Sequence, residues 1–326
     1  MSAFWKKGFG VGLGAGLLGA AVVALRLRTR PVPAPSLPDI ISPSVFARRV
    51  QRTTRGQMVY HASGEGDPVV FLHDFFPGAS SYEWSKIYPA FVPARRVVAP
   101  DWIGFGESER PDRLLRAEDY AQSLFEFCRA TCAGRRPVIV ASGIGAALAC
   151  LAAAQHPEFV SRLILFHPSG TEGWLAGWAP APARAASWSG RGRRWIYANY
   201  CAPPAAIGKW LSSRRSEGPP ALDLEEPVSV YSSFARQYGA GWAIQRIMSG
   251  RFATGALPRL ENVCVPVTVL WPDLAGHLPA ALSRPEPEVR LDHLPGFGSL
   301  APLDRSADLA ARLRVELFSP VRVAEA

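Results

Sequence analysis

The sequence predicts an α/β fold in which a mostly parallel sheet is covered by helices on both faces. Two observations support it: short apolar runs typical of buried parallel strands recur along the chain, and helical patterns separate them. The runs cover 69–72, 96–99, 137–141, 163–166, 267–271 and 289–291, after an alternating strand at 57–62. The helical patterns cover 81–91, 117–132, 144–156 and 305–317. Strand, helix and strand at this spacing imply right-handed crossovers, hence a parallel sheet.

The segment from about 171 to 262 breaks this rhythm. It is rich in Trp, Arg, Pro and Ala, with helical stretches near 194–200 and 228–250. We expect a helical cap inserted between two sheet strands, over the carboxyl ends of the strands. Its aromatic side chains are expected mainly in the core of the cap. The predicted domains are therefore a core of 51–170 and 263–326 and a cap of 171–262.

The first residues differ from the rest of the chain. Residues 8–25 are uncharged and apolar, with Lys6 and Lys7 before them and Arg26 after them. About 18 such residues span about 27 Å as a helix, enough to cross a membrane. We expect an uncleaved single-span anchor at 1–30 and an extended Pro-rich linker at 31–50. A cleaved signal peptide is the alternative, which Arg26 disfavours.

Glycines of this apolar run suggest a partner in the membrane. Gly8, Gly12 and Gly16 fall on one helical face, where small residues four apart let two membrane helices approach closely. The alternative is that glycine is simply frequent in membrane helices. Three further arginines after the anchor favour a cytoplasmic position for the globular part. These are Arg48, Arg49 and Arg52.

Net charge and cysteine spacing limit the classes of partner and cofactor that we expect. A net charge of +9 would suit anionic lipid or nucleic acid. The arginines are scattered rather than interleaved with aromatics in a nucleic-acid pattern, so we expect no nucleic-acid partner. The five cysteines show no metal-ligand spacing, so we expect no metal and no cofactor. Buried free thiols are the simpler interpretation, which weakly favours a reducing compartment.

One strand leads into a turn where many hydrolases carry their nucleophile. Residues 138–147 read VIVASGIGAA. In a nucleophile elbow, the residues two before and two after the apex must be tiny, because strand and helix cross closely. This places Ala141 and Gly145 at the small positions and Gly143 at the apex. An apex at Ser142 would instead place Val140 and Ile144 where no branched side chain fits.

The order of these motifs resembles the capped branch of the α/β-hydrolase superfamily, which includes epoxide hydrolases, haloalkane dehalogenases and pheophytinase-like proteins. The segments are VVFLHDFFP (69–77), SSYEWSK (80–86), VAPDWIGFGES (98–108), DYAQS (119–123), QHPEFV (155–160), LILFHPSG (163–170) and VTVLW (267–271). The resemblance implies covalent chemistry by a nucleophile, an acid and a histidine.

Each of these catalytic positions is altered here. The resemblance places the nucleophile at Gly143, the acid at Ala275 and the histidine at Ser299. In the oxyanion loop His73, Asp74 and Phe75, the usual Gly is Asp74, whose carboxylate would oppose a developing negative charge. Four other residues could supply the nucleophile, acid or histidine in place of the lost groups, namely Ser142, Asp273, His277 and His293.

We therefore predict a membrane-anchored, catalytically inactive protein that serves as a binding, scaffold or accessory subunit of a membrane complex. The vacated site could hold an apolar ligand under the cap or lie beneath a protein-docking surface. The alternative is an active hydrolase of a hydrophobic ester or epoxide that uses a displaced set of catalytic residues. A secreted protein released by signal cleavage would differ only in location.

Overall fold

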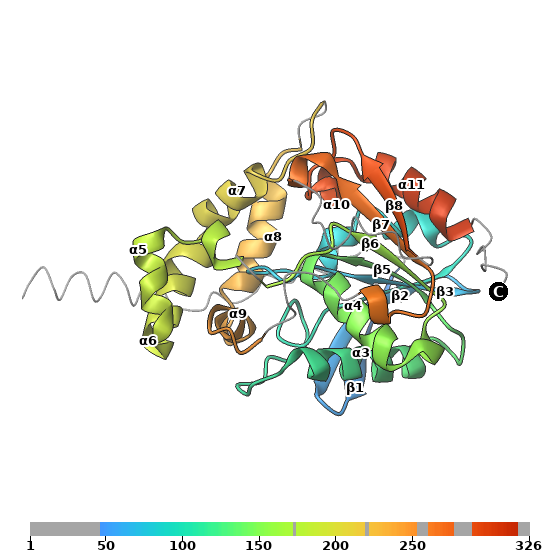
Figure 1. Cartoon of the computed structure of the whole chain (residues 1–326), viewed down its shortest axis with the longest axis horizontal. Helices are drawn as coiled ribbons and strands as arrows, with labels where there is room; N and C mark the ends of the chain where they lie inside the picture. Colours follow the sequence, from blue (N-terminus) through green and yellow to red (C-terminus); the bar gives the residue numbers. More distant parts are fainter. Residues whose placement is uncertain (1–45, 172–173, 219–221, 253–259, 277–288, 319–326) are drawn as a thin grey trace, which may run out of the picture.

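The computed structural model describes residues 46–171, 174–218, 222–252, 260–276 and 289–318. Within these ranges, eight strands form one sheet in the order β1-β2-β4-β3-β5-β6-β7-β8 (Figure 1). They are β1 (Ala47–Thr53), β2 (Gly56–Ser63), β3 (Pro68–Leu72), β4 (Arg96–Pro100), β5 (Val138–Ser142), β6 (Arg162–Phe166), β7 (Val267–Pro272) and β8 (Val289–Leu294). Every pairing from β4 to β8 is parallel, which confirms the mostly parallel sheet.

The first strand, β1, was not predicted. It pairs antiparallel with β2, and β2 pairs antiparallel with β4. Because β1 lies at the edge of the sheet, much of it is exposed and it needs no continuous apolar run. Arg48, Arg49 and Arg52 are exposed on this strand.

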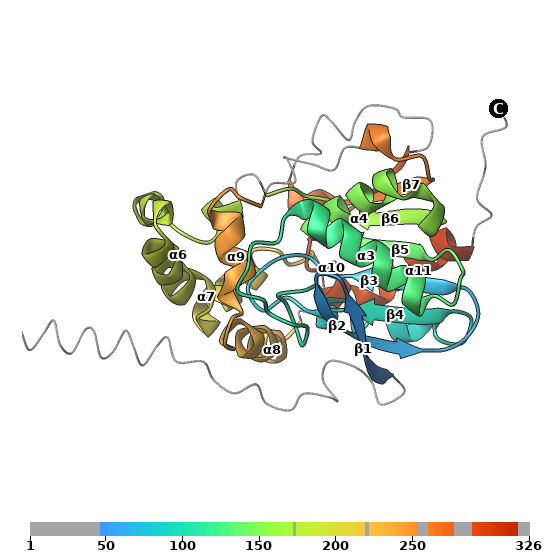
Figure 2. The ribbon, with the colours of Figure 1, turned by 90° about the horizontal axis from the view of Figure 1, so that it is seen from below.

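Helices cover both faces of the sheet, as expected (Figure 2). On one face lie α3 (Ala117–Thr131) and α4 (Gly143–Gln155); on the other lies α11 (Ser306–Phe318), preceded by the short α10 (Ala301–Asp304). The buried strand β3 serves both cores: Val70 and Leu72 pack on the α3 and α4 side, while Val69 and Phe71 pack on the other. This alternation explains why its sequence is apolar throughout.

Further helices between β6 and β7 form a layer to one side of the sheet (Figure 1). They are α5 (Ala181–Arg184), α6 (Gly190–Ile196), α7 (Pro204–Ser212), α8 (Glu225–Ala235) and α9 (Gly241–Met248), with a π-helical turn at Tyr197–Cys201. One hydrogen bond from this insertion to the core runs from Trp174 Nε1 to the carbonyl oxygen of Phe75, at 2.9 Å. The insertion of helices at the expected place is therefore confirmed.

Two local expectations were wrong. The predicted helix at 81–91 is two 3₁₀ turns, Ser81–Trp84 and Tyr88–Phe91. Pro89 has no amide hydrogen to continue an α-helical ladder through this segment. The predicted helix at 228–250 is divided into α8 and α9, where Gly239 has a φ of +78°. Most described aromatic side chains of the cap are buried or pack against the core, as expected, whereas Trp188 is 92% exposed and Trp195 is 39% exposed.

None of the helices in the described ranges is both long and apolar enough to span a bilayer. The predicted anchor, its Gly8, Gly12 and Gly16 face and most of the Pro-rich linker lie outside the described residues.

Candidate functional site

The turn after β5 has the geometry of a nucleophile elbow. Gly143 begins α4 with a φ of +52°, a conformation that side chains with a Cβ rarely adopt. A Cβ on Gly145 would lie 2.4 Å from the carbonyl oxygen of His73, so the backbone after β3 leaves no room for a side chain at residue 145. The sequence pattern predicted a small residue at this position. The apex of the turn therefore falls on Gly143.

The space above Gly143 is filled by the side chain of Asp74. A Cβ on Gly143 would lie 2.0 Å from Asp74 Cγ and 2.0 Å from its Oδ1. Asp74 Oδ1 accepts hydrogen bonds from the backbone amides of Ile144, at 2.7 Å, and Phe75, at 2.6 Å. In α/β-hydrolase folds, an oxyanion hole is built from the amide after the elbow apex and an amide of the loop after β3. The two donors in these positions thus already bind a carboxylate of the chain itself.

The loop that carries Asp74 is held by a buried histidine. His73 Nδ1 donates to the carbonyl oxygen of Asp74 at 2.7 Å, while its Nε2 accepts from the amide of Trp102 at 3.0 Å. Trp102 Nε1 donates in return to the carbonyl oxygen of His73, at 3.0 Å. Burial lowers the pKa of His73, which agrees with a neutral ring in this arrangement. His73 is therefore a structural residue that fixes the position of Asp74.

A second carboxyl group lies beside Asp74. Glu83 Oε2 accepts from the backbone amide of Asp74 at 2.8 Å, and the Glu83 side chain is buried. Burial, together with the negative charge of Asp74, raises the pKa of Glu83 to about 8. Glu83 is therefore mostly protonated at neutral pH, which leaves Asp74 as the charged member of the pair. An acidic residue among the buried aromatics of SYEWSK was the signal that the sequence offered for this role.

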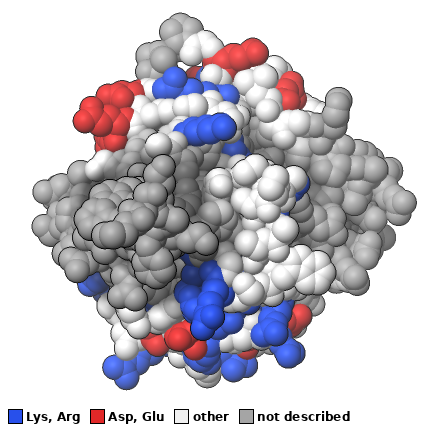
Figure 3. Space-filling model, turned by 90° about the vertical axis from the view of Figure 1, so that its left-hand side faces the viewer, with Lys and Arg blue, Asp and Glu red and all other residues white. Residues whose placement is uncertain are grey.

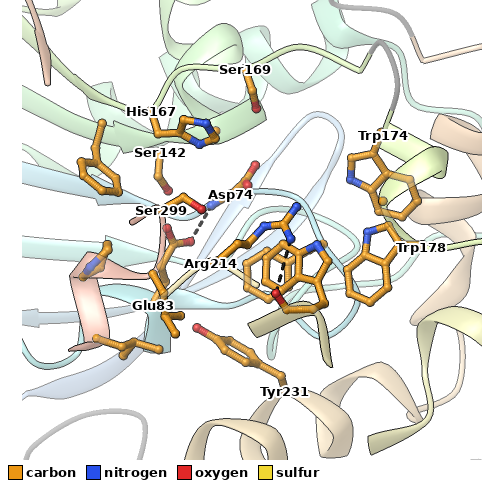
Figure 4. A pocket seen from close by; sticks show the side chains of 18 of the residues that line it. Asp74, Glu83, Ser142, His167, Ser169, Trp174, Trp178, Arg214, Tyr231 and Ser299 are labelled. Atoms are coloured by element: carbon orange, nitrogen blue, oxygen red, sulfur yellow. Dashed lines mark hydrogen bonds between the residues drawn. The ribbon is translucent and has the colours of Figure 1, made fainter. Parts of the chain in front are cut away.

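These groups border a cavity of about 240 Å³ between the core and the cap (Figure 4). Aromatic side chains of the cap form one wall, in which the rings of Trp178 and Trp210 stack with centroids 5.1 Å apart. Phe76 contributes from the core, its ring centroid 4.5 Å from that of Trp210. The residues that line the cavity and are used below are Asp74, Phe76, Glu83, Ser142, Gly143, His167, Ser169, Trp174, Trp178, Trp210, Arg214, Tyr231 and Ser299.

A cation from the cap faces the same cavity. The Arg214 guanidinium lies over the ring of Trp210, 3.9 Å from its centroid. Burial lowers the pKa of Arg214 to about 10, and the negative charge of Asp74 opposes this shift. Arg214 therefore remains positively charged at neutral pH. It follows α7 in a segment whose arginines looked scattered in the sequence, so only the folded cap reveals its position.

The histidine that reaches the cavity is His167, which the sequence analysis did not select. It follows the carboxyl end of β6 with a φ of +46°. Burial lowers the pKa of His167 to about 4; the charge of Asp74 counteracts this shift and that of Arg214 adds to it. The ring is therefore neutral at physiological pH. Its position immediately after a buried strand in LILFHPSG was the available signal.

The structure separates the predicted site residues into two groups. Gly143, Ser142 and Ser299 line the cavity, and Ser142 Oγ donates weakly to the carbonyl oxygen of Leu72 at 3.4 Å. Ala275, Asp273 and His293 are not among the residues that line it.

Asp273 and His293 instead face each other at the surface, with Oδ1 and Nδ1 3.4 Å apart and side chains 44% and 53% exposed. His277 lies outside the described residues. Within the described part of the chain, no group of three or more His, Cys, Asp or Glu side chains could hold a metal ion.

Comparison with known proteins identifies the fold. Residues 67–200 match the family model described as alpha/beta hydrolase fold. The chain is 34% identical over 133 residues to a 2-hydroxymuconate semialdehyde hydrolase of Pseudomonas sp. (strain CF600), covering 38% of this chain and 46% of that protein. It is 39% identical over 112 residues to a haloalkane dehalogenase of Bradyrhizobium diazoefficiens, covering 32% of this chain and 34% of that protein.

The aligned regions thus span less than half of each of these relatives. The structure also superimposes on that of a proposed alpha/beta hydrolase from Nostoc sp PCC 7120 with a TM-score of 0.67. That match has 20% sequence identity and covers 84% of this chain and 99% of the other. The chain therefore has the α/β-hydrolase fold, and the named proteins that share part of its sequence are hydrolases.

Proposed function

We propose that this protein is an α/β-hydrolase-fold protein without hydrolase chemistry, whose pocket binds an uncharged aromatic or apolar ligand. We further propose that it serves as an accessory subunit at a membrane. The observation that carries the first proposal is the Asp74 carboxylate, which occupies the space over Gly143 and accepts from both amides of the oxyanion-hole positions.

This arrangement removes two requirements of acyl transfer at once. Gly143 has no side chain that could attack a carbonyl carbon. A substrate oxygen could reach the amides of Ile144 and Phe75 only if Asp74 moved out. Even then, a nearby carboxylate would repel the negative charge that develops in the transition state. His167 is neutral and could accept a proton, but no elbow nucleophile stands beside it to be activated.

The charges of the pocket favour an uncharged ligand. At neutral pH, Asp74 and Arg214 carry opposite charges at the same cavity, while Glu83 and His167 are mostly neutral. Figure 4 shows the Asp74 carboxylate between His167 and Arg214. Trp174, Trp178, Trp210 and Tyr231 supply apolar surface for a planar ligand. The hydroxyl groups of Ser142, Ser169 and Ser299 supply neutral hydrogen-bonding groups.

The membrane part of the proposal rests on the apolar run at 8–25 and its flanking cations. The face of Gly8, Gly12 and Gly16 favours an integral-membrane partner. Extraction in a mild detergent should recover a stoichiometric membrane protein with the chain, and Gly12→Leu with Gly16→Leu should weaken the association. Recovery as a lone monomer would contradict the accessory role.

A second candidate is a hydrolase that uses Asp74 itself as a displaced nucleophile. The favouring observation is that a carboxylate and a neutral histidine face one cavity. Asp74 would displace a leaving group from a saturated carbon to form an ester, and water deprotonated by His167 would hydrolyse that ester, giving an alcohol and the protonated leaving group. Against it, Asp74 Cγ and both carboxylate oxygens lie within 2.3 Å of the Gly143 Cβ position, so the group is held deep in the elbow.

Turnover and labelling of the full-length protein distinguish these functions. The proposal expects no hydrolysis of aryl esters, epoxides or haloalkanes, no labelling by a fluorophosphonate, and saturable quenching of tryptophan fluorescence by 2-naphthol. Ester turnover that disappears in Ser142→Ala would overturn it. Haloalkane or epoxide turnover that disappears in Asp74→Asn, with heavy oxygen from labelled water incorporated into Asp74, would instead establish the second candidate.

A further inference from the structure

An exposed aromatic surface lies on the cap around Trp188. The Trp188 side chain ends the 3₁₀ turn Ala185–Trp188 and is 92% exposed, and Trp195 of α6 is 39% exposed. Small apolar residues around Trp188 are exposed as well, namely Ala181, Pro182 and Ala185. Large aromatic side chains are seldom left in water to this extent unless they contact something else. We call this region, with the arginines described next, the Trp188 surface.

The Trp188 surface is strongly basic. No Asp or Glu occurs from Trp174 to Ser216, a stretch that contains seven Lys and Arg residues. None of its six arginines forms an ion pair with a described carboxylate, and four of them lie near Trp188 in the sequence: Arg184, Arg191, Arg193 and Arg194. Burial lowers the pKa of Arg193, and the positive charges of Arg251, Arg246 and Arg194 lower it further. The cations therefore lie close enough to repel one another.

Figure 3 looks at the end of the molecule that carries α5 and α6. On this face described Lys and Arg side chains lie above and below the centre of the view, and the Asp and Glu side chains lie nearer its margins. A partner that contacts this end must therefore tolerate exposed Trp rings and compensate unpaired positive charge.

We propose that the Trp188 surface docks on an anionic lipid bilayer. Tryptophan rings are favoured at the headgroup level of a membrane, where the apolar ring leaves water while the indole N–H stays hydrated. Arginines bind lipid phosphates with charge-assisted hydrogen bonds, and an anionic leaflet offsets their mutual repulsion. Exposed alanine and proline beside Trp188 extend the apolar contact, which favours a bilayer over a nucleic acid. This inference does not depend on what the pocket binds.

The test uses the full-length chain, because the expected anchor must be present in every sample. In a Cys264→Ser background, which removes the one exposed thiol of the described residues, an environment-sensitive fluorophore is attached to Trp188→Cys. The matched control carries the fluorophore at Val50→Cys, an exposed site on β1. Both proteins are reconstituted into vesicles of phosphatidylcholine, with or without phosphatidylglycerol, and flotation confirms that each is membrane-bound.

We expect the label at residue 188 to shift to the blue and to be quenched by doxyl lipids in anionic vesicles. The label at residue 50 should do neither. Adding Arg191→Gln and Arg194→Gln, or raising the salt concentration, should remove most of the shift. The proposal is wrong if the label at residue 188 stays in water in anionic vesicles, or if it inserts equally in vesicles of phosphatidylcholine alone. It is also wrong if RNA shifts this label in detergent solution while anionic vesicles do not.

Discussion

The Asp74 carboxylate lies where a side chain on Gly143 would begin, with Cγ only 2.0 Å from the position of that Cβ. Glycine at residue 143 and aspartate at residue 74 are therefore a matched pair, since either side chain would exclude the other. The positive end of helix α4 faces the Asp74 carboxylate. This carboxylate accepts hydrogen bonds from two backbone amides that would otherwise have to donate to water. The absent nucleophile and the unusual carboxylate are thus one structural feature.

This pairing predicts the effect of adding a methyl group at the elbow. Gly143→Ala should destabilise the fold by about 3 kcal/mol, because it combines a strained positive φ with overpacking against Asp74. Asp74→Ala removes all three close atoms, so the same change in that background should cost only about 1 kcal/mol from the backbone. Chemical denaturation of the four proteins measures the coupling free energy.

The matched control is Gly145→Ala, whose Cβ would contact the backbone oxygen of His73. Asp74→Ala leaves that oxygen in place, so it should not rescue this variant. If Asp74→Ala rescued both alanine variants equally, or neither of them, the specific pairing of residues 74 and 143 would be refuted.

Glu83 should make the protein less stable as the pH rises. The pKa of Glu83 is about 8 in the fold and 4.5 in its unperturbed state, so folded and unfolded chains are both protonated below pH 4.5. Between pH 4.5 and 8 the unfolded chain releases a proton that the folded chain keeps, and stability falls by an amount on the order of a few kcal/mol.

Glu83→Gln keeps an oxygen that can accept from the amide of Asp74 but cannot ionise. The free energy of unfolding of this variant, measured from pH 4.5 to 9, should therefore lack that decline. Exposed Glu65→Gln serves as the control for losing a carboxyl group. An unchanged slope in Glu83→Gln would show that Glu83 is already ionised in the fold.

His167 should act with the opposite sign and in a lower pH range. Its pKa is about 4 in the fold and 6.5 in its unperturbed state. As the pH falls from 6.5 to 4, the unfolded chain binds a proton that the folded chain does not, so stability is lost. His167→Asn suits the positive φ at this residue and cannot be protonated. The free energy of unfolding of this variant, measured by chemical denaturation from pH 4 to 6.5, should therefore fall less than that of the wild type. An equal fall in both proteins would contradict the prediction.

The sequence predicted most of the sheet and the elbow because both depend on local constraints. A buried parallel strand must be apolar throughout, as in β3, and a close crossing must exclude a Cβ, as at Gly145. The role of Asp74 could not be predicted in this way. From the sequence, a carboxylate beside an oxyanion site suggested only that it would repel the negative charge of a substrate. In the fold, the Asp74 side chain itself occupies the oxyanion site and accepts hydrogen bonds from its two amides. Glu83, His167 and Arg214 come from three distant segments, so only tertiary structure shows that they share a cavity.

The opposite charges of Asp74 and Arg214 predict how ligand selectivity can be changed. In the wild type, uncharged 2-naphthol should bind more tightly than 2-naphthoate or 2-naphthylmethylammonium, because Asp74 repels the carboxylate ligand and Arg214 repels the ammonium ligand.

Asp74→Asn keeps an oxygen that can accept from the two amides but leaves the charge of Arg214 uncompensated. The affinity for 2-naphthoate should therefore rise about tenfold, which corresponds to about 1.4 kcal/mol. Arg214→Gln should instead favour the ammonium ligand, since the Asp74 charge then stands alone. Arg236 is half-buried and is not among the residues that line the cavity, so Arg236→Gln is the control that should change neither affinity. Tryptophan quenching measures all three ligands, and equal responses to both charge removals would show that the two side chains do not face a shared ligand.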